Sequence, residues 1–260
     1  MKLRLWRHVR ELVGYAPLTL AFGEGGWIAI DERDWLQSFV LANGAYEPEV
    51  WTALARYAQA DEVVWDVGAY IGTFALTAAQ DPRVAHVCAF EPDPRTLETL
   101  RTNLALNTRA IRLYPFALSD TTETRMLISG PAANAGMSTF GPSQSTGMRD
   151  HLSNPSEHLP TFDVACRTAD ELVASGAAPA PTLIKLDVEG WEYPVLNGAR
   201  GILESTRLKA VVLETGCDAE GGILDGRVRQ ILTEYGFTLG RISRPSGDLL
   251  GVENYLAVRL

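Results

Sequence analysis

The 260-residue sequence has few cysteines and no long apolar run. Its three cysteines, Cys88, Cys166 and Cys217, show no C-x-x-C spacing and cannot all pair with one another. This usage argues against a disulfide framework and favours a reduced, cytoplasmic setting. No apolar stretch approaches the length of a membrane span, so none is expected. Pro17 interrupts the apolar stretch near the amino terminus and no A-x-A cleavage site follows, which argues against a signal peptide.

Clustered positive charge is also scarce. The formal net charge is −9 and the pI is near 5.0, and no stretch concentrates Lys or Arg beyond the first ten residues. Binding to a phosphate backbone depends on clustered cations, so nucleic acid is not an expected partner. With 46% hydrophobic residues the chain can bury a full core and is most simply one domain. Nothing in the pattern specifies an oligomeric state.

The first dense signal is the run Val-Val-Trp-Asp-Val-Gly-Ala-Tyr-Ile-Gly at residues 63–72. Its β-branched apolar start is typical of a buried parallel strand. Gly68 and Gly72 then bracket a sharp turn, where glycine permits a positive φ or the close approach of a ligand. The first N–H groups of the helix expected from Thr73 lack intrahelical partners and favour an anion. The sequence therefore predicts a nucleotide-type cofactor site at this turn.

The spacing of the glycines indicates which cofactor. A dinucleotide fingerprint requires G-x-G-x-x-G, whereas Ala69, Tyr70 and Ile71 fill the space between the two glycines here. NAD and FAD are therefore disfavoured. Glu91 follows the strand-like run 84–90 and stands where an acid accepts the hydroxyls of a ribose. An acid that binds ribose, in a loop that lacks the dinucleotide turn, indicates a cofactor with adenosine but no phosphates. S-adenosylmethionine fits this description, and its carboxylate would lie at the start of the helix.

Two further segments are expected near this cofactor. Tyr46 and Glu47 lead into a helix before the first strand, where they either close over the cofactor or only cap the helix. Residues 116–118 follow a third strand at 111–113. In a doubly wound sheet Phe116 and Ala117 would flank an adenine, the alternative being plain core packing.

The second dense signal is the strand-like run 183–190, which ends in Asp187, Glu189 and Gly190. If the chain stays extended, the two acids share one face beside the reactive end of the cofactor. In the alternative reading Glu189 only caps the next helix. Glu214 ends a similar run, so Asp187 and Glu214 could instead share a divalent cation. Hard cations need more oxygen ligands than this pattern supplies, so no metal site is predicted.

A change of composition marks residues 129–160, which are rich in Gly, Pro, Ser, Asn and Met. A loop of this length is usually a lid, a binding loop or disordered. His151 and His158 within it are candidate general bases, because histidine titrates near neutral pH, although both could be surface residues. Residues 1–45 are expected to form an amino-terminal helix and hairpin extension. Residues 46–260 are expected to form one catalytic domain that carries this lid-like insertion and ends in an antiparallel hairpin.

The motifs resemble the FkbM family of S-adenosylmethionine-dependent methyltransferases, in order over roughly residues 45–215. The matching segments are 66–73 (DVGAYIGT), 90–92 (FEP), 117–120 (ALSD), 134–139, 184–192 (IKLDVEGWE) and 196–199 (LNGA). The resemblance implies an α/β, Rossmann-like class I methyltransferase fold with a mostly parallel central sheet and helices on both faces. It also implies cofactor contacts from the loop at 66–72, from Glu91 and near Ala117, and O-methylation of hydroxyls on natural products or sugars.

The sequence thus predicts an S-adenosylmethionine-dependent O-methyltransferase with a small-molecule hydroxyl acceptor. A non-catalytic cofactor-binding module and an NAD-dependent oxidoreductase remain the alternatives. The catalytic candidates are Asp187, Glu189, His151 and His158. The cofactor-binding candidates are Tyr46, Glu47, Asp66, Gly68, Ala69, Tyr70, Gly72, Thr73, Glu91, Pro92, Phe116, Ala117 and Asp187.

Overall fold

The structure is a computed structural model that describes residues 17–141, 158–243 and 251–259. Residues 1–16, where the amino-terminal helix is predicted, lie outside the described residues, as do His151 and residues 244–250.

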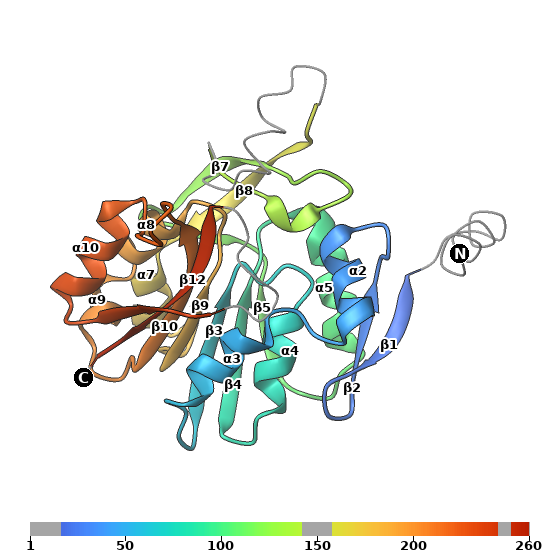
Figure 1. The fold of residues 1–260 in the computed structure, drawn as a ribbon, viewed down its shortest axis with the longest axis horizontal. Helices are drawn as coiled ribbons and strands as arrows, with labels where there is room; N and C mark the ends of the chain where they lie inside the picture. Colours follow the sequence, from blue (N-terminus) through green and yellow to red (C-terminus); the bar gives the residue numbers. More distant parts are fainter. Residues whose placement is uncertain (1–16, 142–157, 244–250, 260) are drawn as a thin grey trace.

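The described chain is built around a seven-stranded sheet with the order β11-β12-β10-β9-β3-β4-β5 (Figure 1). The strands β10, β9, β3, β4 and β5 are parallel, and β12 runs antiparallel to both β10 and β11. The mostly parallel sheet and the antiparallel pair at its edge confirm the predicted fold class. The strand bounds are β3 Glu62–Val67, β4 Val84–Phe90, β5 Ile111–Tyr114, β9 Leu183–Leu186, β10 Ala210–Gly216, β11 Thr238–Arg241 and β12 Val252–Val258.

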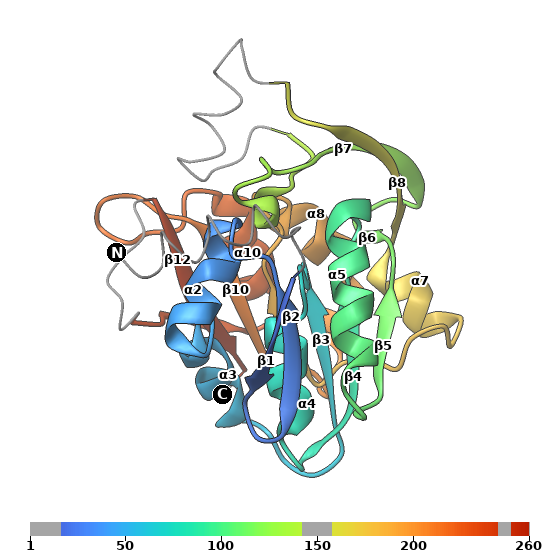
Figure 2. The ribbon, with the colours of Figure 1, turned by 90° about the vertical axis from the view of Figure 1, so that its right-hand side faces the viewer.

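Helices cover both faces of this sheet, as predicted. One face carries α3 Pro48–Ala55, α4 Thr73–Gln80 and α5 Pro94–Ala105, and the other carries α7 Ala169–Ala174, α8 Glu192–Asn197, α9 Arg200–Glu204 and α10 Gly226–Glu234 (Figures 1 and 2). In the described ranges, no helix combines the length and the apolar character needed to cross a membrane.

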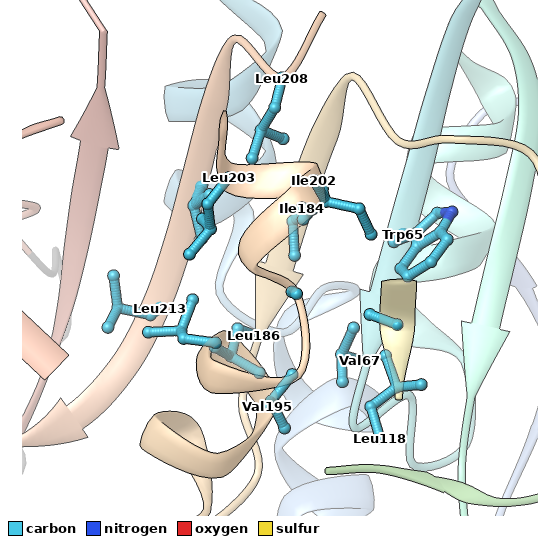
Figure 3. Packing of buried hydrophobic residues seen from close by; sticks show 14 of the residues in the cluster. Trp65, Val67, Leu118, Ile184, Leu186, Val195, Ile202, Leu203, Leu208 and Leu213 are labelled. Atoms are coloured by element: carbon cyan, nitrogen blue, oxygen red, sulfur yellow. The ribbon is translucent and has the colours of Figure 1, made fainter. Parts of the chain in front are cut away.

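Both faces of the central strands are buried, which explains why their sequences are almost uninterrupted apolar runs. Along β3, Val63, Trp65 and Val67 pack toward α8 and α9, while Val64 packs toward α3 and α4. Figure 3 shows the first of these layers, in which side chains of β3, β9 and β10 meet those of the helices. The labelled residues are Trp65, Val67, Leu118, Ile184, Leu186, Val195, Ile202, Leu203, Leu208 and Leu213.

The hairpin predicted within residues 1–45 forms as β1 Leu18–Phe22 and β2 Gly26–Ile30, and it packs against α4 and α5. Asn103 on α5 joins it to the core, since its side chain accepts from Ala29 N at 2.6 Å and donates to Ile71 O at 2.8 Å. The helix α2, Trp35–Asn43, follows the hairpin and was not predicted.

A separate three-stranded sheet lies over the carboxyl ends of the central strands (Figure 2). Its strand β7, Glu123–Ile128, pairs antiparallel with β8, Thr161–Arg167. The short strand β6, Ala117–Leu118, pairs parallel with β8. Residues 117–118, which were predicted only to follow the third strand, therefore form a strand of this separate sheet.

Candidate functional site

A pocket lies at the carboxyl ends of β3, β4 and β9, the edge where open α/β sheets bind their ligands. All the predicted cofactor-binding residues except Asp66 and Gly72 line it. Those that do are Tyr46, Glu47, Gly68, Ala69, Tyr70, Thr73, Glu91, Pro92, Phe116, Ala117 and Asp187. The topology thus brings together residues that are up to 141 positions apart in the sequence, from Tyr46 to Asp187.

The loop after β3 packs directly against the end of β9. Gly68 has φ +81°, and a Cβ at this position would lie 1.7 Å from the carbonyl oxygen of Asp187. Asp187 N donates to Val67 O at 3.0 Å, which keeps the two strand ends in register. The position therefore requires glycine on two grounds, the left-handed backbone and the missing space.

Asp66 lies behind this loop and does not line the pocket. Its side chain is fully buried, and its Oδ2 accepts from Ala75 N in the first turn of α4 at 3.0 Å. Burial raises the pKa of Asp66 to about 6, against the opposing effect of Lys185. Gly72, with φ +91°, is the residue before α4 and also lies outside the pocket lining. Both residues therefore shape the turn into α4, and the structure does not place them as cofactor contacts.

Glu91 follows β4 and faces the pocket. Its Oε2 accepts from Tyr70 N and its Oε1 accepts from Asp93 N, both at 2.8 Å. Burial raises the pKa of Glu91 to about 7, while these backbone donors and Thr96 lower it. A carboxylate can accept about four hydrogen bonds. Glu91 therefore retains the capacity to accept from a ribose hydroxyl.

Three carboxylates gather on the opposite side of the pocket. Single oxygens of Asp187, Glu189 and Glu214 all lie within 4.8 Å of one another. The predicted reason for this was wrong in part, because β9 ends at Leu186 and the chain then turns, with φ +49° at Glu189. Asp187 and Glu189 therefore do not share a face through an extended backbone, although both line the pocket. Their hard oxygen atoms are of the type that binds a divalent cation, but such clusters are common without one.

Lys185, within β9, joins the glycine loop to these acids. Its Nζ donates to Gly68 O at 2.8 Å and lies 3.4 Å from Asp66 Oδ1 and 3.2 Å from Asp187 Oδ2. Lys185 was not among the predicted site residues. A lone cation between Ile184 and Leu186 in a buried strand was the available signal, since a buried charge requires a partner.

The described part of the predicted lid, residues 129–141, is anchored at both sides of the pocket. At the start of α5, Asp93 Oδ2 accepts from Ser138 Oγ at 2.6 Å and also from Ser129. At the turn after β9, Thr139 Oγ1 donates to Glu189 O at 2.9 Å. These contacts hold Ala135, Gly136, Ser138 and Phe140 in the pocket lining.

The helix α2 completes this side of the site. Its N-cap residue Asp34 accepts from Gln37 N at 3.1 Å and from Ala135 N at 2.9 Å. Gln37 Nε2 donates to Tyr70 Oη at 2.7 Å. The helix α2 therefore contacts both the segment 129–141 and the loop after β3, and Leu36 lines the pocket.

Two aromatic side chains that were not predicted as site residues, Phe140 and Trp191, also line the pocket. The rings of Phe140 and Trp191 have centroids 5.2 Å apart, and the Arg125 guanidinium lies 4.8 Å from the Trp191 ring centroid. His158 is exposed and is not among the described residues that line the pocket. Of the four catalytic candidates, the structure brings together only Asp187 and Glu189, since His151 lies outside the described residues.

Comparison with known proteins assigns this site to a family. Residues 66–239 match the methyltransferase FkbM domain. The chain belongs to the FkbM methyltransferase family. It is 31% identical to the hexuronic acid methyltransferase AglP of Haloferax volcanii over 211 residues, 81% of this chain and 75% of that protein. It is 32% identical to the 31-O-demethyl-FK506 methyltransferase FkbM of Streptomyces tacrolimicus over 198 residues, 68% of this chain and 73% of that protein.

Family membership confirms the resemblance predicted from the motifs and identifies the chain as a methyltransferase. Among solved structures, fibrillarin of Aeropyrum pernix in complex with S-adenosyl-L-methionine aligns at 13% identity and a TM-score of 0.48, over 80% of this chain and 74% of that chain. The match to the FkbM domain begins at Asp66, so the hairpin β1–β2 and the helix α2, whose Leu36 lines the pocket, lie outside the matched residues.

Proposed function

We propose that this FkbM-family protein transfers the methyl group of S-adenosylmethionine to a hydroxyl of a small molecule. The observation that supports it most is the convergence of Glu91, the loop at Gly68 and Asp187 in one pocket at the ends of three neighbouring strands. The named relatives act on a hexuronic acid and on 31-O-demethyl-FK506. These names favour a hydroxyl of a sugar or a natural product as the acceptor.

The residues present fit the cofactor. Glu91 would accept from the ribose, and the apolar Phe116 and Ala117 would flank the adenine. Thr73 begins α4, where N–H groups of the first turn favour a carboxylate. When bound, the cofactor supplies an activated methyl group on its sulfonium. The protein then has to align the acceptor with that methyl group and keep water out.

A hydroxyl becomes a good nucleophile only when its proton is removed. Asp187 is the proposed base, because its carboxylate lines the pocket and its Oδ2 is fixed by Lys185 at 3.2 Å. Glu189 lies beside it and would hold or accept the same proton. The wall of Phe140 and Trp191 would exclude water and pack against the acceptor.

Isothermal titration calorimetry tests the cofactor first. We expect binding of S-adenosylhomocysteine and no binding of NAD(H). An NAD-dependent oxidoreductase would give the reverse result. Transfer of a labelled methyl group from S-adenosylmethionine to a panel of hexuronic acid glycosides and macrolides then tests the reaction.

The double substitution Asp187→Asn and Glu189→Gln tests the role of the two acids. We expect a loss of turnover of about 100-fold or more, which is the contribution of a general base, with S-adenosylhomocysteine still bound. A non-catalytic binding module would keep its cellular function in this variant. Full turnover in the variant would rule out both acids as bases.

A further inference from the structure

Lys185 is a deeply buried cation in the middle of the site. Its side chain is 11% exposed and lies within β9 between Ile184 and Leu186, both of which belong to the hydrophobic core. Burial of an ammonium group is unfavourable unless the group is paired and hydrogen-bonded. The contacts that Lys185 makes are therefore a strong constraint on the residues around it.

Three contacts of the ammonium all lie at the proposed cofactor site. Gly68 O, at 2.8 Å, belongs to the glycine loop. Asp66 Oδ1, at 3.4 Å, belongs to the residue that holds the first turn of α4. Asp187 Oδ2, at 3.2 Å, belongs to the proposed base. One cation thus connects the loop, the following helix and the reactive end of the pocket.

We propose that Lys185 is a positioning residue of the methyl-transfer site, which holds the carbonyl of Gly68 and the carboxylate of Asp187 in one fixed arrangement. This inference rests on the proposed function, because its consequence is the shape of the cofactor pocket. The charge of Lys185 acts through Gly68 and Asp187, and no direct contact with cofactor or acceptor is required of it.

The close packing of the two strand ends explains why a cation is needed here. The site of a Gly68 Cβ coincides with the Asp187 backbone, so the loop and the end of β9 are already in contact. Asp66 and Asp187 place two carboxylates around the same small volume, and the charge of Asp187 raises the pKa of Asp66. Without the ammonium these carboxylates would repel each other and Gly68 O would lose its donor. The loop and Asp187 would then move apart.

A matched ion pair at the opposite end of β3 provides the control. Lys209 pairs with Glu62, whose side chain is fully buried, as that of Asp66 is. Neither Lys209 nor Glu62 lines the pocket. Removal of either lysine leaves a buried carboxylate in β3 without its cation, so both changes should lower the melting temperature. Only Lys185 should also affect the pocket.

The experiment compares wild-type protein, Lys185→Met and Lys209→Met by thermal unfolding and by calorimetric titration with S-adenosylhomocysteine, well below each melting temperature. We expect Lys185→Met to weaken binding by about 10- to 100-fold, the range for lost hydrogen bonds to charged groups, and Lys209→Met to stay within about two-fold of wild type. A purely structural role would lower the melting temperature without changing the affinity of the folded protein. Equal affinities of Lys185→Met and wild type, or an equal loss in Lys209→Met, would overturn the proposal.

A second pair of variants covers the case in which Lys185→Met does not fold. Asp66→Asn combined with Lys185→Met removes the carboxylate that would be left unpaired, and Asp66→Asn alone is its reference. We expect the double variant to fold and to bind S-adenosylhomocysteine more weakly than the reference. Equal affinity, or failure of the double variant to fold, would show that Lys185 only supports the fold and would overturn the proposal. If wild-type protein does not bind the ligand at all, the proposed function falls and this inference with it.

Discussion

The protonation state of Glu91 should make cofactor binding depend on pH. Its side chain is buried and its pKa is raised from 4.5 to about 7, chiefly by burial. A shift of this size corresponds to a cost on the order of 3 kcal/mol for the ionised form in the folded protein. Between pH 4.5 and 7 the folded protein keeps a proton that the unfolded chain has released. The stability of the ligand-free protein should therefore fall as the pH rises through this window.

Cofactor binding should show the opposite trend, because the ionised carboxylate is the better acceptor for ribose hydroxyls. With a pKa of about 7, the ionised fraction of Glu91 is about 0.9 at pH 8 and about 0.1 at pH 6. If only this form binds, the affinity for S-adenosylhomocysteine falls about tenfold from pH 8 to pH 6, or ~1.4 kcal/mol. Calorimetry in buffers of different ionisation enthalpy should also detect release of about half a proton at pH 7.

The substitution Glu91→Gln tests this reasoning. It should remove the pH dependence and weaken binding at pH 8 by about 1–3 kcal/mol, the range for a lost hydrogen bond to a charged group. Glu192 is the matched control, since it is 2% exposed, its pKa is also raised to about 7, and it does not line the pocket. Glu192→Gln should keep the tenfold change. A pH-independent affinity of wild-type protein, or a slope that persists in Glu91→Gln, would refute the role of Glu91.

Three further predictions test other parts of the site. Gly68→Ala should abolish measurable binding of S-adenosylhomocysteine by calorimetry, because its Cβ would lie 1.7 Å from Asp187 O; retained binding would contradict the described loop. Tyr70→Phe removes the acceptor of the Gln37 Nε2 hydrogen bond and should lower the unfolding free energy by about 1 kcal/mol in urea, with no change expected if the helix α2 does not contact the loop. Glu192→Gln should raise the melting temperature at pH 8 but not at pH 4, because burial raises the pKa of Glu192 from 4.5 to about 7 and the destabilisation builds up only above the lower of these pH values; an equal effect at pH 4 and pH 8 would contradict the raised pKa.

The side of the pocket formed by the ends of β3 and β4 was predictable because its signals are local. The strand β3 is apolar on both faces, so it is buried, and Gly68 follows it at once. Glu91 follows β4 in the same way, and adjacent parallel strands end at the same edge of the sheet. From these rules the sequence alone placed both residues together. Their exact partners, such as Tyr70 N on Glu91, depend on the turn geometry, which the sequence does not specify.

The part of the pocket formed by α2, residues 135–140 and Trp191 was harder to predict, because it depends on contacts between segments that are distant in the sequence. The helix α2 has clear local signals, since Asp34 is a good N-cap and Gly44 ends the helix with φ +74°. Its contact with Ala135 is set by tertiary packing across 101 positions of the chain. The pairing of Phe140 with Trp191 likewise brings together the lid segment and the turn after β9.

Glu189 was predicted to lie beside Asp187, and it does, but the backbone conformation that brings it there differs from the predicted one. An extended chain would put Glu189 on the face of Asp187, but the turn with φ +49° does so instead. Such a backbone is costly for a residue other than glycine, and the Thr139 Oγ1 hydrogen bond to Glu189 O at 2.9 Å supports it from the lid segment. The position of Glu189, one of the two proposed bases, therefore depends on the segment that contains Thr139. If a bound substrate displaced Thr139, this hydrogen bond would break, so we expect substrate binding to change the position of Glu189.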